Sequence, residues 1–312
     1  MSQTLHVALH QAGAAGLDRL DAQWLLLHAL GTPLRDRAWL MAHADDPLTP
    51  EQAAQFEHLC RRRLDGEPVA YLTGQRGFYG LTLHVDARVL DPRPDTENLV
   101  DWALDLLRHH HNGGMAQVLD LGTGSGAVAL AIQHQCPSAQ VWAVDACMNA
   151  LAVARANADR LHLPIHCIHN HWLRDWTARQ DTSPPWSSAV PMQFDLIVSN
   201  PPYLRTDDPH LPALHHEPRA ALVGGLDGLD DLREIVASAA EHLRPDGWLL
   251  LEHGFDQSTE VAALLRSHGY QAIDHRHDLG GHVRCTGGRR PANPLRGQAQ
   301  VSAAATVNSP VG

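Results

Sequence analysis

The chain has 312 residues, of which 44% are hydrophobic and 19% charged, an ordinary composition for one large or two smaller globular domains. Its formal net charge of -11 disfavours tight binding to a nucleic-acid backbone, which requires a basic surface. No apolar run approaches membrane-spanning length, and the first residues show no signal-peptide pattern. We therefore expect a cytoplasmic protein without membrane contact that acts on a small molecule or a basic protein partner.

The sequence gives little indication of a metal site. Its five cysteines include no Cys-x-x-Cys pair, so neither a zinc site nor a disulfide framework is expected, and a reducing cytoplasm is the default compartment. The run from His109 to His111 places three adjacent histidines that cannot share one helix face. Histidines at the end of a helix also suit its dipole. We predict that no metal is bound.

The first part of the chain has the periodicity of helices. Apolar residues recur at helical spacing from Leu17 to Leu30. A further helix is predicted to begin at Thr49, which can form a capping box with Gln52, and to run to about Leu64. Residues 1–73 are therefore predicted to form an N-terminal helical domain. Its apolar stripes fit a packed bundle, and they fit a substrate-recognition domain equally well.

Residues 74–88 are predicted to form a β-hairpin that links two domains. Glycines flank aromatic residues in this segment, and Leu81 to Val85 alternates as a strand does. The next stretch contains Pro92 and Pro94, which stiffen the approach to a helix. Asp95 or Thr96 is the predicted N-cap of that helix.

Strands alternate with helices from Gln117 onward, which predicts a mostly parallel sheet with helices on both faces. The predicted strands are Val118 to Leu121, Val141 to Asp145, Pro164 to His169, Phe194 to Ser199, Trp248 to Glu252, Tyr270 to Arg276 and Val283 to Thr286. The catalytic domain is predicted at 89–290. Residues 177–193 are predicted to be a surface loop, 204–228 an ordered active-site cover, and 291–312 a disordered tail.

The Asn-Pro-Pro-Tyr stretch at residues 200–203 follows an apolar strand and predicts a rigid hydrogen-bond acceptor site. Two prolines cannot continue a central strand, so the chain must leave the sheet at a carboxyl end, where α/β sheets place their ligands. A side-chain carbonyl, a backbone carbonyl of fixed direction and a flat ring suit a planar amide or amino group. An ordinary turn would explain the Asn-Pro pair alone. The residues are Asn200, Pro201, Pro202 and Tyr203.

A glycine-rich turn lies upstream, between a strand and a helix. Without Cβ atoms, its backbone can approach a ligand closely. Asp120 precedes the turn and would repel a pyrophosphate but suit a cation. Asp145 ends the next strand, where it can accept hydrogen bonds from ribose hydroxyls. The turn has a Gly-x-Gly-x-Gly spacing and consists of Gly122, Thr123, Gly124, Ser125 and Gly126.

The turn, Asp145 and the Asn-Pro-Pro-Tyr stretch together resemble the class I S-adenosylmethionine-dependent methyltransferases, and Asn-Pro-Pro-Tyr is similar to the signature of enzymes that methylate amino and amide nitrogens. The resemblance implies an α/β, Rossmann-like methyltransferase domain beside a small helical bundle, with S-adenosylmethionine as cofactor. It implies that the cofactor is bound by Gly122, Thr123, Gly124, Ser125, Gly126, Asp145, Trp172 and Asn200. It also implies that the catalytic residues are Asn200, Pro201, Pro202 and Tyr203.

Further segments resemble the HemK-type release factor glutamine methyltransferases over nearly the whole chain up to about Arg290. These segments are Arg62 to Gly74, Leu90 to Glu97, Glu217-Pro218 and Leu250 to Gly254. The resemblance implies N5-methylation of the glutamine in the Gly-Gly-Gln loop of a peptide chain release factor, and no nucleic-acid substrate. The alternatives are a ribosomal-protein glutamine methyltransferase, an adenine-N6 methyltransferase and a non-catalytic binding protein.

The chain departs from that family at some positions. Asp91 and Gly287 replace aliphatic residues, and Gly77 replaces a common glutamate. His171 stands where an aspartate is usual near the adenine; Trp172 beside it fits an adenine-stacking wall and a core aromatic about equally. Carboxylates in the cover and the next helix are predicted to steer a basic partner, although a solvated acidic face explains them as well. They are Asp207, Asp208, Glu217, Asp227, Asp230 and Asp231.

Overall fold

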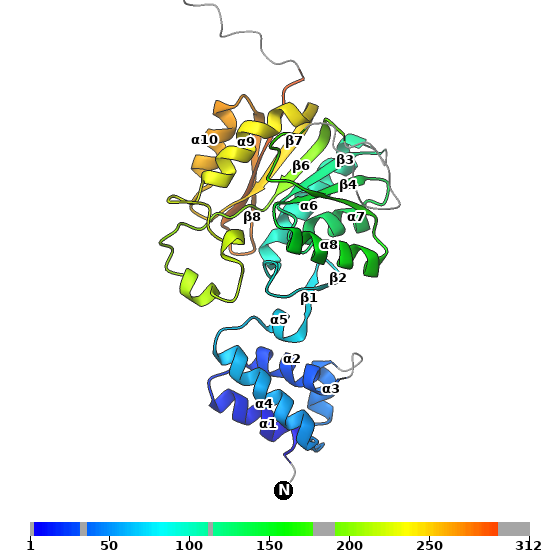
Figure 1. The fold of residues 1–312 in the computed structure, drawn as a ribbon, viewed down its shortest axis with the longest axis vertical. Coiled ribbons are helices and arrows are strands. Elements are labelled where there is room, and N and C mark those ends of the chain that lie inside the picture. The colour runs from blue at the N-terminus through cyan, green and yellow to red at the C-terminus, as the bar shows by residue number, and fades with distance from the viewer. Residues whose placement is uncertain (1–2, 32–35, 112–114, 177–190, 293–312) are drawn as a thin grey trace, which may run out of the picture.

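The computed structural model describes residues 3–31, 36–111, 115–176 and 191–292 (Figure 1). Nearly all of the predicted tail and most of the predicted surface loop lie outside these residues. The helical N-terminal part lies at one end of the molecule, and the sheet with its helices lies at the other. No helix in the described ranges combines the length and the apolar character needed to cross a membrane.

The N-terminal part consists of short helices around a core of their own. At the start of one of them, Thr49 Oγ1 accepts from the Gln52 amide at 3.2 Å, and Gln52 Oε1 accepts from the Thr49 amide at 3.0 Å, so the predicted capping box is confirmed. Leu25, Leu26 and Phe56 are among the buried residues of this core. The helices are α1 (Leu5–Ala14), α2 (Arg19–Ala29), α3 (Arg37–Ala42), α4 (Pro50–Leu64) and α5 (Val69–Thr73).

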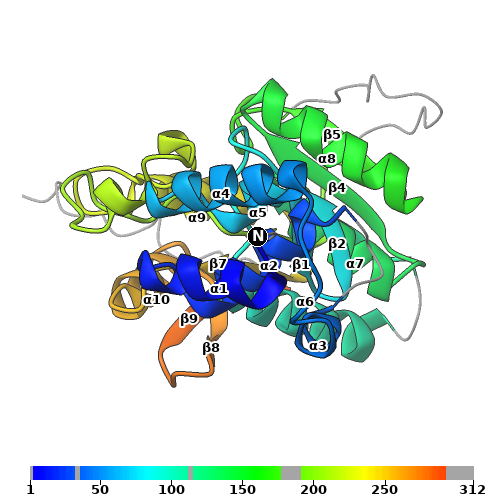
Figure 2. The same cartoon turned by 90° about the horizontal axis from the view of Figure 1, so that it is seen from below.

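A β-hairpin follows the helices, as predicted. Strands β1 (Gln75–Phe78) and β2 (Leu81–His84) pair antiparallel. The hairpin is attached to helix α8 (Met148–Leu161), because Asn157 accepts from the His84 amide at 2.7 Å and donates to the His84 carbonyl at 2.9 Å. Figure 1 shows the hairpin between the helical part and the sheet, and Figure 2 shows α1 and α4 in front of the sheet from the N-terminal end.

The remaining strands form one seven-stranded sheet with the order β5-β4-β3-β6-β7-β9-β8. The pairs from β5 to β7 are parallel, and β9 is antiparallel to both of its neighbours, which confirms the predicted mostly parallel sheet. Strand β7 begins at Leu243 and not at Trp248, because Leu243 pairs with Phe194. The strands are β3 (Gln117–Leu121), β4 (Gln140–Asp145), β5 (Ile165–His169), β6 (Phe194–Ser199), β7 (Leu243–Glu252), β8 (Gln271–His277) and β9 (Val283–Arg289).

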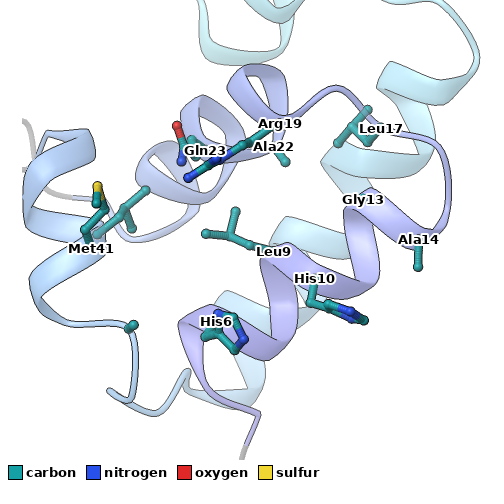
Figure 3. Close-up of a pocket in the computed structure, with 12 residues that line it drawn as sticks. His6, Leu9, His10, Gly13, Ala14, Leu17, Arg19, Ala22, Gln23 and Met41 are labelled. Atoms are coloured by element: carbon teal, nitrogen blue, oxygen red, sulfur yellow. The ribbon is translucent and has the colours of Figure 1, made fainter.

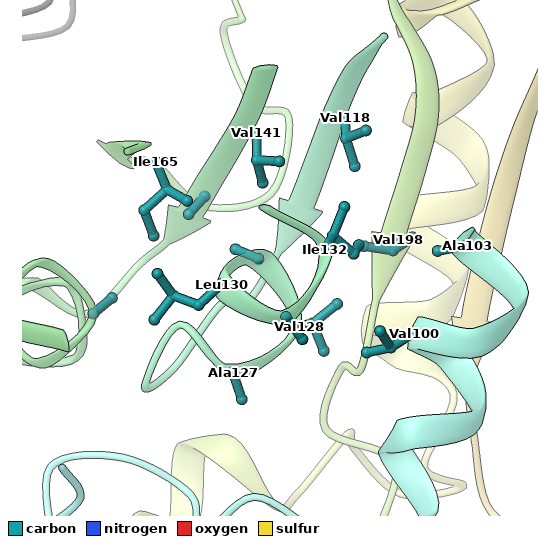
Figure 4. Close-up of a cluster of buried hydrophobic side chains, with 14 of the residues drawn as sticks. Val100, Ala103, Val118, Ala127, Val128, Leu130, Ile132, Val141, Ile165 and Val198 are labelled. Carbon is teal, nitrogen blue, oxygen red and sulfur yellow. The ribbon is translucent and has the colours of Figure 1, made fainter. Parts of the chain in front are cut away.

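Helices cover both faces of this sheet. Alternate strand residues serve the two sides, as the two-residue period of a strand requires. Val118 and Val198 pack with α8 and with helices α6 (Glu97–His111) and α7 (Ala127–Gln135), as Figure 4 shows for α6 and α7. Leu119 and Ile197 pack with helices on the opposite face. Each face of the sheet therefore has its own apolar core under the helices that cover it. The opposite helices are α9 (Asp230–His242) and α10 (Ser258–Ser267).

Strands β3 and β6 mark the point where the chain order reverses. The chain runs outward from β3 through β4 to β5, and then returns to place β6 on the other side of β3. Their carboxyl ends are in register, with Leu121 opposite Ser199, and Ser199 Oγ donates to the Leu121 carbonyl at 2.7 Å. Open α/β sheets bind ligands at such a switch point. The glycine turn and Asn200 therefore begin side by side.

Candidate active site

The glycine turn after β3 is held by the neighbouring strand and by Asp120. The amides of Gly122 and Thr123 both donate to the Val144 carbonyl, at 2.8 and 2.9 Å. Asp120 Oδ2 accepts from Thr123 Oγ1 at 2.7 Å and from the Ala129 amide at 3.2 Å, and burial raises the pKa of Asp120 to about 7. The expectation that this carboxylate suits a bound cation needs correction, because the carboxylate is 2% exposed and bonded within the turn.

Asp145 lies at the end of β4, beside the same turn. Its Oδ2 accepts from the Gly124 amide at 2.9 Å, and its Oδ1 accepts from the Cys147 amide at 2.8 Å. Each carboxylate oxygen has a further lone pair, so the group can accept additional hydrogen bonds. A Cβ built on Gly124 would meet no atom within 4 Å, which leaves the turn open where a ligand would lie. The structure thus brings two predicted cofactor contacts together.

Trp172 lies against the opposite part of the turn. A Cβ on Gly122 would be 3.1 Å from the indole, and the indole Nε1 donates to Asp231 Oδ1 at 3.0 Å. The ring also packs against the core on the α9 face. Trp172 therefore belongs to the core and also forms one side of the turn. His171 is exposed, and its Nδ1 is 3.4 Å from Glu234 Oε1 of α9.

Asn200 is the first residue after β6, and its side-chain amide is fixed by Thr96. Asn200 Nδ2 donates to Thr96 Oγ1 at 3.1 Å. Asp95 and Thr96 directly precede helix α6 in a short 3-10 helix, η1 (Pro94–Thr96), and the N-cap role predicted for one of them stays a prediction. With the amide nitrogen facing Thr96, the Asn200 oxygen faces the other side of the planar group.

A buried carboxylate, that of Glu252, lies at the end of β7. It is 1% exposed, and burial raises the pKa of Glu252 to about 7. The Tyr203 hydroxyl lies 3.5 Å from Glu252 Oε1, and burial raises the pKa of Tyr203 above its ordinary value. Glu252 thus lies beside the predicted catalytic residue Tyr203. Sequence reasoning placed Glu252 in a family segment and gave it no role.

An ion pair between the half-buried Arg93 and the buried Glu217 joins the Pro-Arg-Pro stretch to the cover. Arg93 Nη2 donates to Glu217 Oε1 at 2.5 Å, and Glu217 Oε2 accepts from the Asp91 amide at 3.2 Å. Arg76 Nε lies 3.4 Å from Asp91 Oδ1, so the aspartate at this unusual position has a cationic neighbour. The inclusion of Glu217 among steering charges is wrong, because its side chain is 2% exposed and paired with Arg93.

The predicted cover packs directly on the Asn-Pro-Pro-Tyr backbone. A Cβ on Gly224 would overlap the Pro202 carbonyl oxygen, and one on Gly228 would overlap the Tyr203 carbonyl oxygen. Gln257 Nε2 also donates to the Tyr203 carbonyl at 3.1 Å. Only residues without a Cβ allow this approach. The glycines of the cover were a signal in the sequence that could have identified the contact.

The other predicted steering carboxylates have local partners. Asp227 and Asp230 both pair with Arg233, and Asp208 pairs with His210 at 2.8 Å. Asp231 accepts from Trp172, as described above. Asp207 lies 3.6 Å from Arg205. Steering by the exposed members of the group stays a prediction.

A cavity of about 620 Å³ lies elsewhere, among the N-terminal helices α1 to α3 (Figure 3). Leu9 and Met41 give it an apolar lining, and His6 and Arg19 add polar atoms. None of the predicted catalytic or cofactor residues lines it. The cavity is thus separate from the glycine turn and Asn200.

A glycine turn and an acidic strand end at the switch point of such a sheet form a site for a ligand with a ribose. With the match to a methyltransferase family model, they make the chain a class I S-adenosylmethionine-dependent methyltransferase. Residues 3–74 match the family model of the PrmC N-terminal domain, and residues 96–217 match that of the methyltransferase small domain. The release factor glutamine methyltransferase of Xylella fastidiosa (strain Temecula1) is 45% identical over 288 residues, covering 91% of this chain and 98% of its own.

The enzyme of the same name from Bordetella pertussis is 44% identical over 277 residues, covering 88% of this chain and 95% of its own. The chain belongs to the release factor glutamine methyltransferase family. In fold it is also similar to the hMettl16 catalytic domain solved with a MAT2A 3'UTR hairpin, with a TM-score of 0.50 and 14% identity. That likeness covers 78% of this chain and 82% of the other, and at this identity it concerns the fold alone.

Proposed function

We propose that the chain methylates the side-chain amide nitrogen (N5) of the glutamine in the Gly-Gly-Gln motif of a peptide chain release factor. The observation that carries the proposal is the hydrogen bond from Asn200 Nδ2 to Thr96, which leaves the Asn200 oxygen as a fixed acceptor beside the glycine turn. The relatives named release factor glutamine methyltransferase support this substrate. Release factors act in translation, which supports a cytoplasmic location.

An amide nitrogen is a poor nucleophile because its lone pair is delocalised into the carbonyl. In the proposed mechanism, Asn200 Oδ1 and the Pro201 carbonyl accept the two amide hydrogens of the glutamine. These bonds hold the nitrogen in one orientation and increase its electron density. The same carbonyl dipoles stabilise the positive charge that develops on the nitrogen. Tyr203 packs on the amide plane, and Pro202 keeps the backbone rigid.

S-adenosylmethionine supplies an electrophilic methyl group on its sulfonium. The open face of the glycine turn fits such a ligand, because no atom lies within 4 Å of a Cβ position at Gly124. We propose that the turn from Gly122 to Gly126, including Thr123 and Ser125, lies against the cofactor. Asp145 would accept ribose hydroxyls, Trp172 would form a wall for the adenine, and Asn200 would border the methyl group.

The domain limits predicted from the sequence are retained in this proposal. Residues 1–73 would recognise the substrate, 74–88 would link the two parts, and 89–290 would carry the reaction. The apolar cavity between α1, α2 and α3 supports a recognition role, because it offers a surface that the catalytic residues do not use (Figure 3). The exposed carboxylates of the cover would attract a basic release factor, so binding is expected to weaken as salt increases.

The proposal is tested by transfer of label from S-adenosylmethionine to purified candidate acceptors. Release factor, ribosomal protein and DNA are incubated separately with the full chain, and the modified residue is mapped by mass spectrometry. Label on the Gly-Gly-Gln glutamine, absent when that residue is replaced by glutamate, is expected. Label only on ribosomal protein or DNA would overturn the substrate assignment. No label on any acceptor, with intact cofactor binding, would contradict enzymatic activity.

A further inference from the structure

Outside the catalytic site, three side chains in the described part of the chain are spaced as metal ligands are. Asp65, His215 and His216 each offer a ligand atom, and these atoms all lie within 4.8 Å of one another. Asp65 directly follows helix α4, whereas the two histidines follow the 3-10 helix η2 (Leu211–Leu214) in the cover. The ligands come from segments 150 residues apart, so no local spacing in the sequence indicates them.

Hydrogen bonds already orient both imidazoles. His215 Nδ1 lies 2.9 Å from the Pro212 carbonyl, and a carbonyl can only accept, so Nδ1 carries the proton and Nε2 keeps its lone pair. His216 Nε2 lies 3.3 Å from the Asp65 carbonyl and 3.7 Å from Asp65 Oδ2. By the same argument this nitrogen carries the proton in the metal-free protein, so a metal that binds through it displaces this hydrogen bond and requires the other tautomer. A backbone carbonyl that fixes the tautomer of a histidine is a common support for metal ligation.

We propose that Asp65, His215 and His216 bind one divalent transition metal ion, for which Zn²⁺ is the best match. Two imidazoles and a carboxylate suit Zn²⁺, whereas Mg²⁺ and Ca²⁺ prefer oxygen ligands alone. Three protein ligands leave a fourth position for water in a tetrahedral site. The Asp65 side chain is 80% exposed, so the ion can enter without any opening of the fold.

The position of the site gives the ion a structural consequence. It would join the end of helix α4 in the N-terminal part to the cover of the catalytic domain. His216 is followed directly by Glu217, which binds Arg93 of the Pro-Arg-Pro stretch. Metal binding would therefore hold the helical part and the cover in one arrangement. This inference is independent of the proposed substrate.

The test uses the full chain without a histidine tag, titrated with Zn²⁺ by calorimetry and with Co²⁺ by visible absorption. We expect one site per chain whose metal affinity exceeds that of any other histidine in the chain. Bound Co²⁺ should show the intense absorption bands of tetrahedral coordination. His216→Ala should lower the metal affinity of that site at least about tenfold, because even the loss of a group that only supports a ligand lowers metal affinity by about this factor. The matched control is His210→Ala, an exposed histidine of the same cover segment, which should bind like the wild type.

Asp65→Asn is a second variant, chosen because this exposed side chain has no role in the core. It keeps the size of the residue, and it should also weaken the site. Zn²⁺ should raise the melting temperature of the wild type and of His210→Ala, but not that of His216→Ala. Equal affinities in the wild type, His216→Ala and Asp65→Asn would overturn the proposal. An octahedral Co²⁺ spectrum at saturation would overturn it as well.

Discussion

The side-chain amide of Asn200 donates to Thr96 Oγ1 at 3.1 Å, across 104 residues of chain. Thr96 is buried and directly precedes helix α6. Its Oγ1 accepts in this bond, so the nitrogen of the Asn200 amide faces Thr96. The Asn200 oxygen therefore faces the opposite side of the planar amide.

Replacement of Thr96 by valine should slow methyl transfer without weakening cofactor binding. Valine has a similar shape but no oxygen, so the Asn200 amide would be free to rotate. We expect turnover to fall about tenfold to a hundredfold, as misorientation of a reacting group typically costs. Thr96→Ser keeps the hydroxyl and should retain most activity. Equal turnover of the valine variant and the wild type would contradict the orienting role.

Asn200→Ala removes the proposed acceptor itself. We expect methyl transfer to fall by about a hundredfold to a thousandfold, comparable to the loss of one oxyanion-hole donor. Cofactor affinity, measured by calorimetry, should remain largely intact. Asn149→Ala, at an exposed position of α8, is the matched control. Near-normal turnover of Asn200→Ala would remove Asn200 from the mechanism.

The elements predicted correctly are those with a local signal. The capping box at Thr49 and the β1–β2 hairpin need only neighbouring residues, so periodicity and turn chemistry suffice to find them. Thr96 directly precedes α6, as a typical N-cap does. Its hydroxyl also accepts from Asn200, a contact across 104 residues that no local pattern indicates.

The polar contacts that complete the site have no local signal. Arg93 and Glu217 are 124 residues apart, and nothing in their immediate sequence distinguishes this ion pair from two unpaired surface charges. Glu217 was therefore grouped with exposed carboxylates, although it is 2% exposed in the structure. Asp145 could be placed because the end of a strand fixes its position.

Asp145→Asn should weaken cofactor binding while the fold is retained. Asparagine keeps one acceptor oxygen, which can serve only one of the Gly124 and Cys147 amides, and it loses the charge and the second acceptor. Since hydrogen bonds to a charged group contribute about 1.5–3 kcal/mol, an affinity loss of at least about tenfold is expected. Calorimetry with S-adenosylhomocysteine measures it. Asp159→Asn, exposed on α8, is the control, and equal affinities of both variants would argue against a ribose contact.

Gly224→Ala should disturb the cover and, through it, the Asn-Pro-Pro-Tyr backbone. The added Cβ would overlap the Pro202 carbonyl oxygen, which belongs to rigid backbone and cannot give way easily. Overpacking of this kind typically costs about 1–3 kcal/mol, measured as the free energy of unfolding in urea. Gly77→Ala is the control, because its Cβ would meet no atom within 4 Å. Equal stability of the two variants would contradict the prediction, because it would mean that the cover backbone shifts to accommodate the added Cβ.

Stability should fall as the pH rises through the range in which Glu252 ionises. Burial raises the pKa of Glu252 from 4.5 to about 7, so the folded state holds this proton more tightly than the unfolded state. Between these two values the folded state binds more protons, and the free energy of unfolding therefore decreases with pH. Asp120 adds a change of the same sign, because burial raises its pKa from 3.8 to about 7.

Glu252→Gln separates these contributions. Glutamine keeps the size of the side chain but cannot ionise, so the free energy of unfolding should decrease less steeply between pH 4.5 and about 7 than in the wild type. A residual slope from Asp120 should remain in the variant. Urea unfolding at several pH values gives both slopes. If the variant and the wild type show the same slope, Glu252 is already ionised in the folded protein below this range, and its burial does not control its charge.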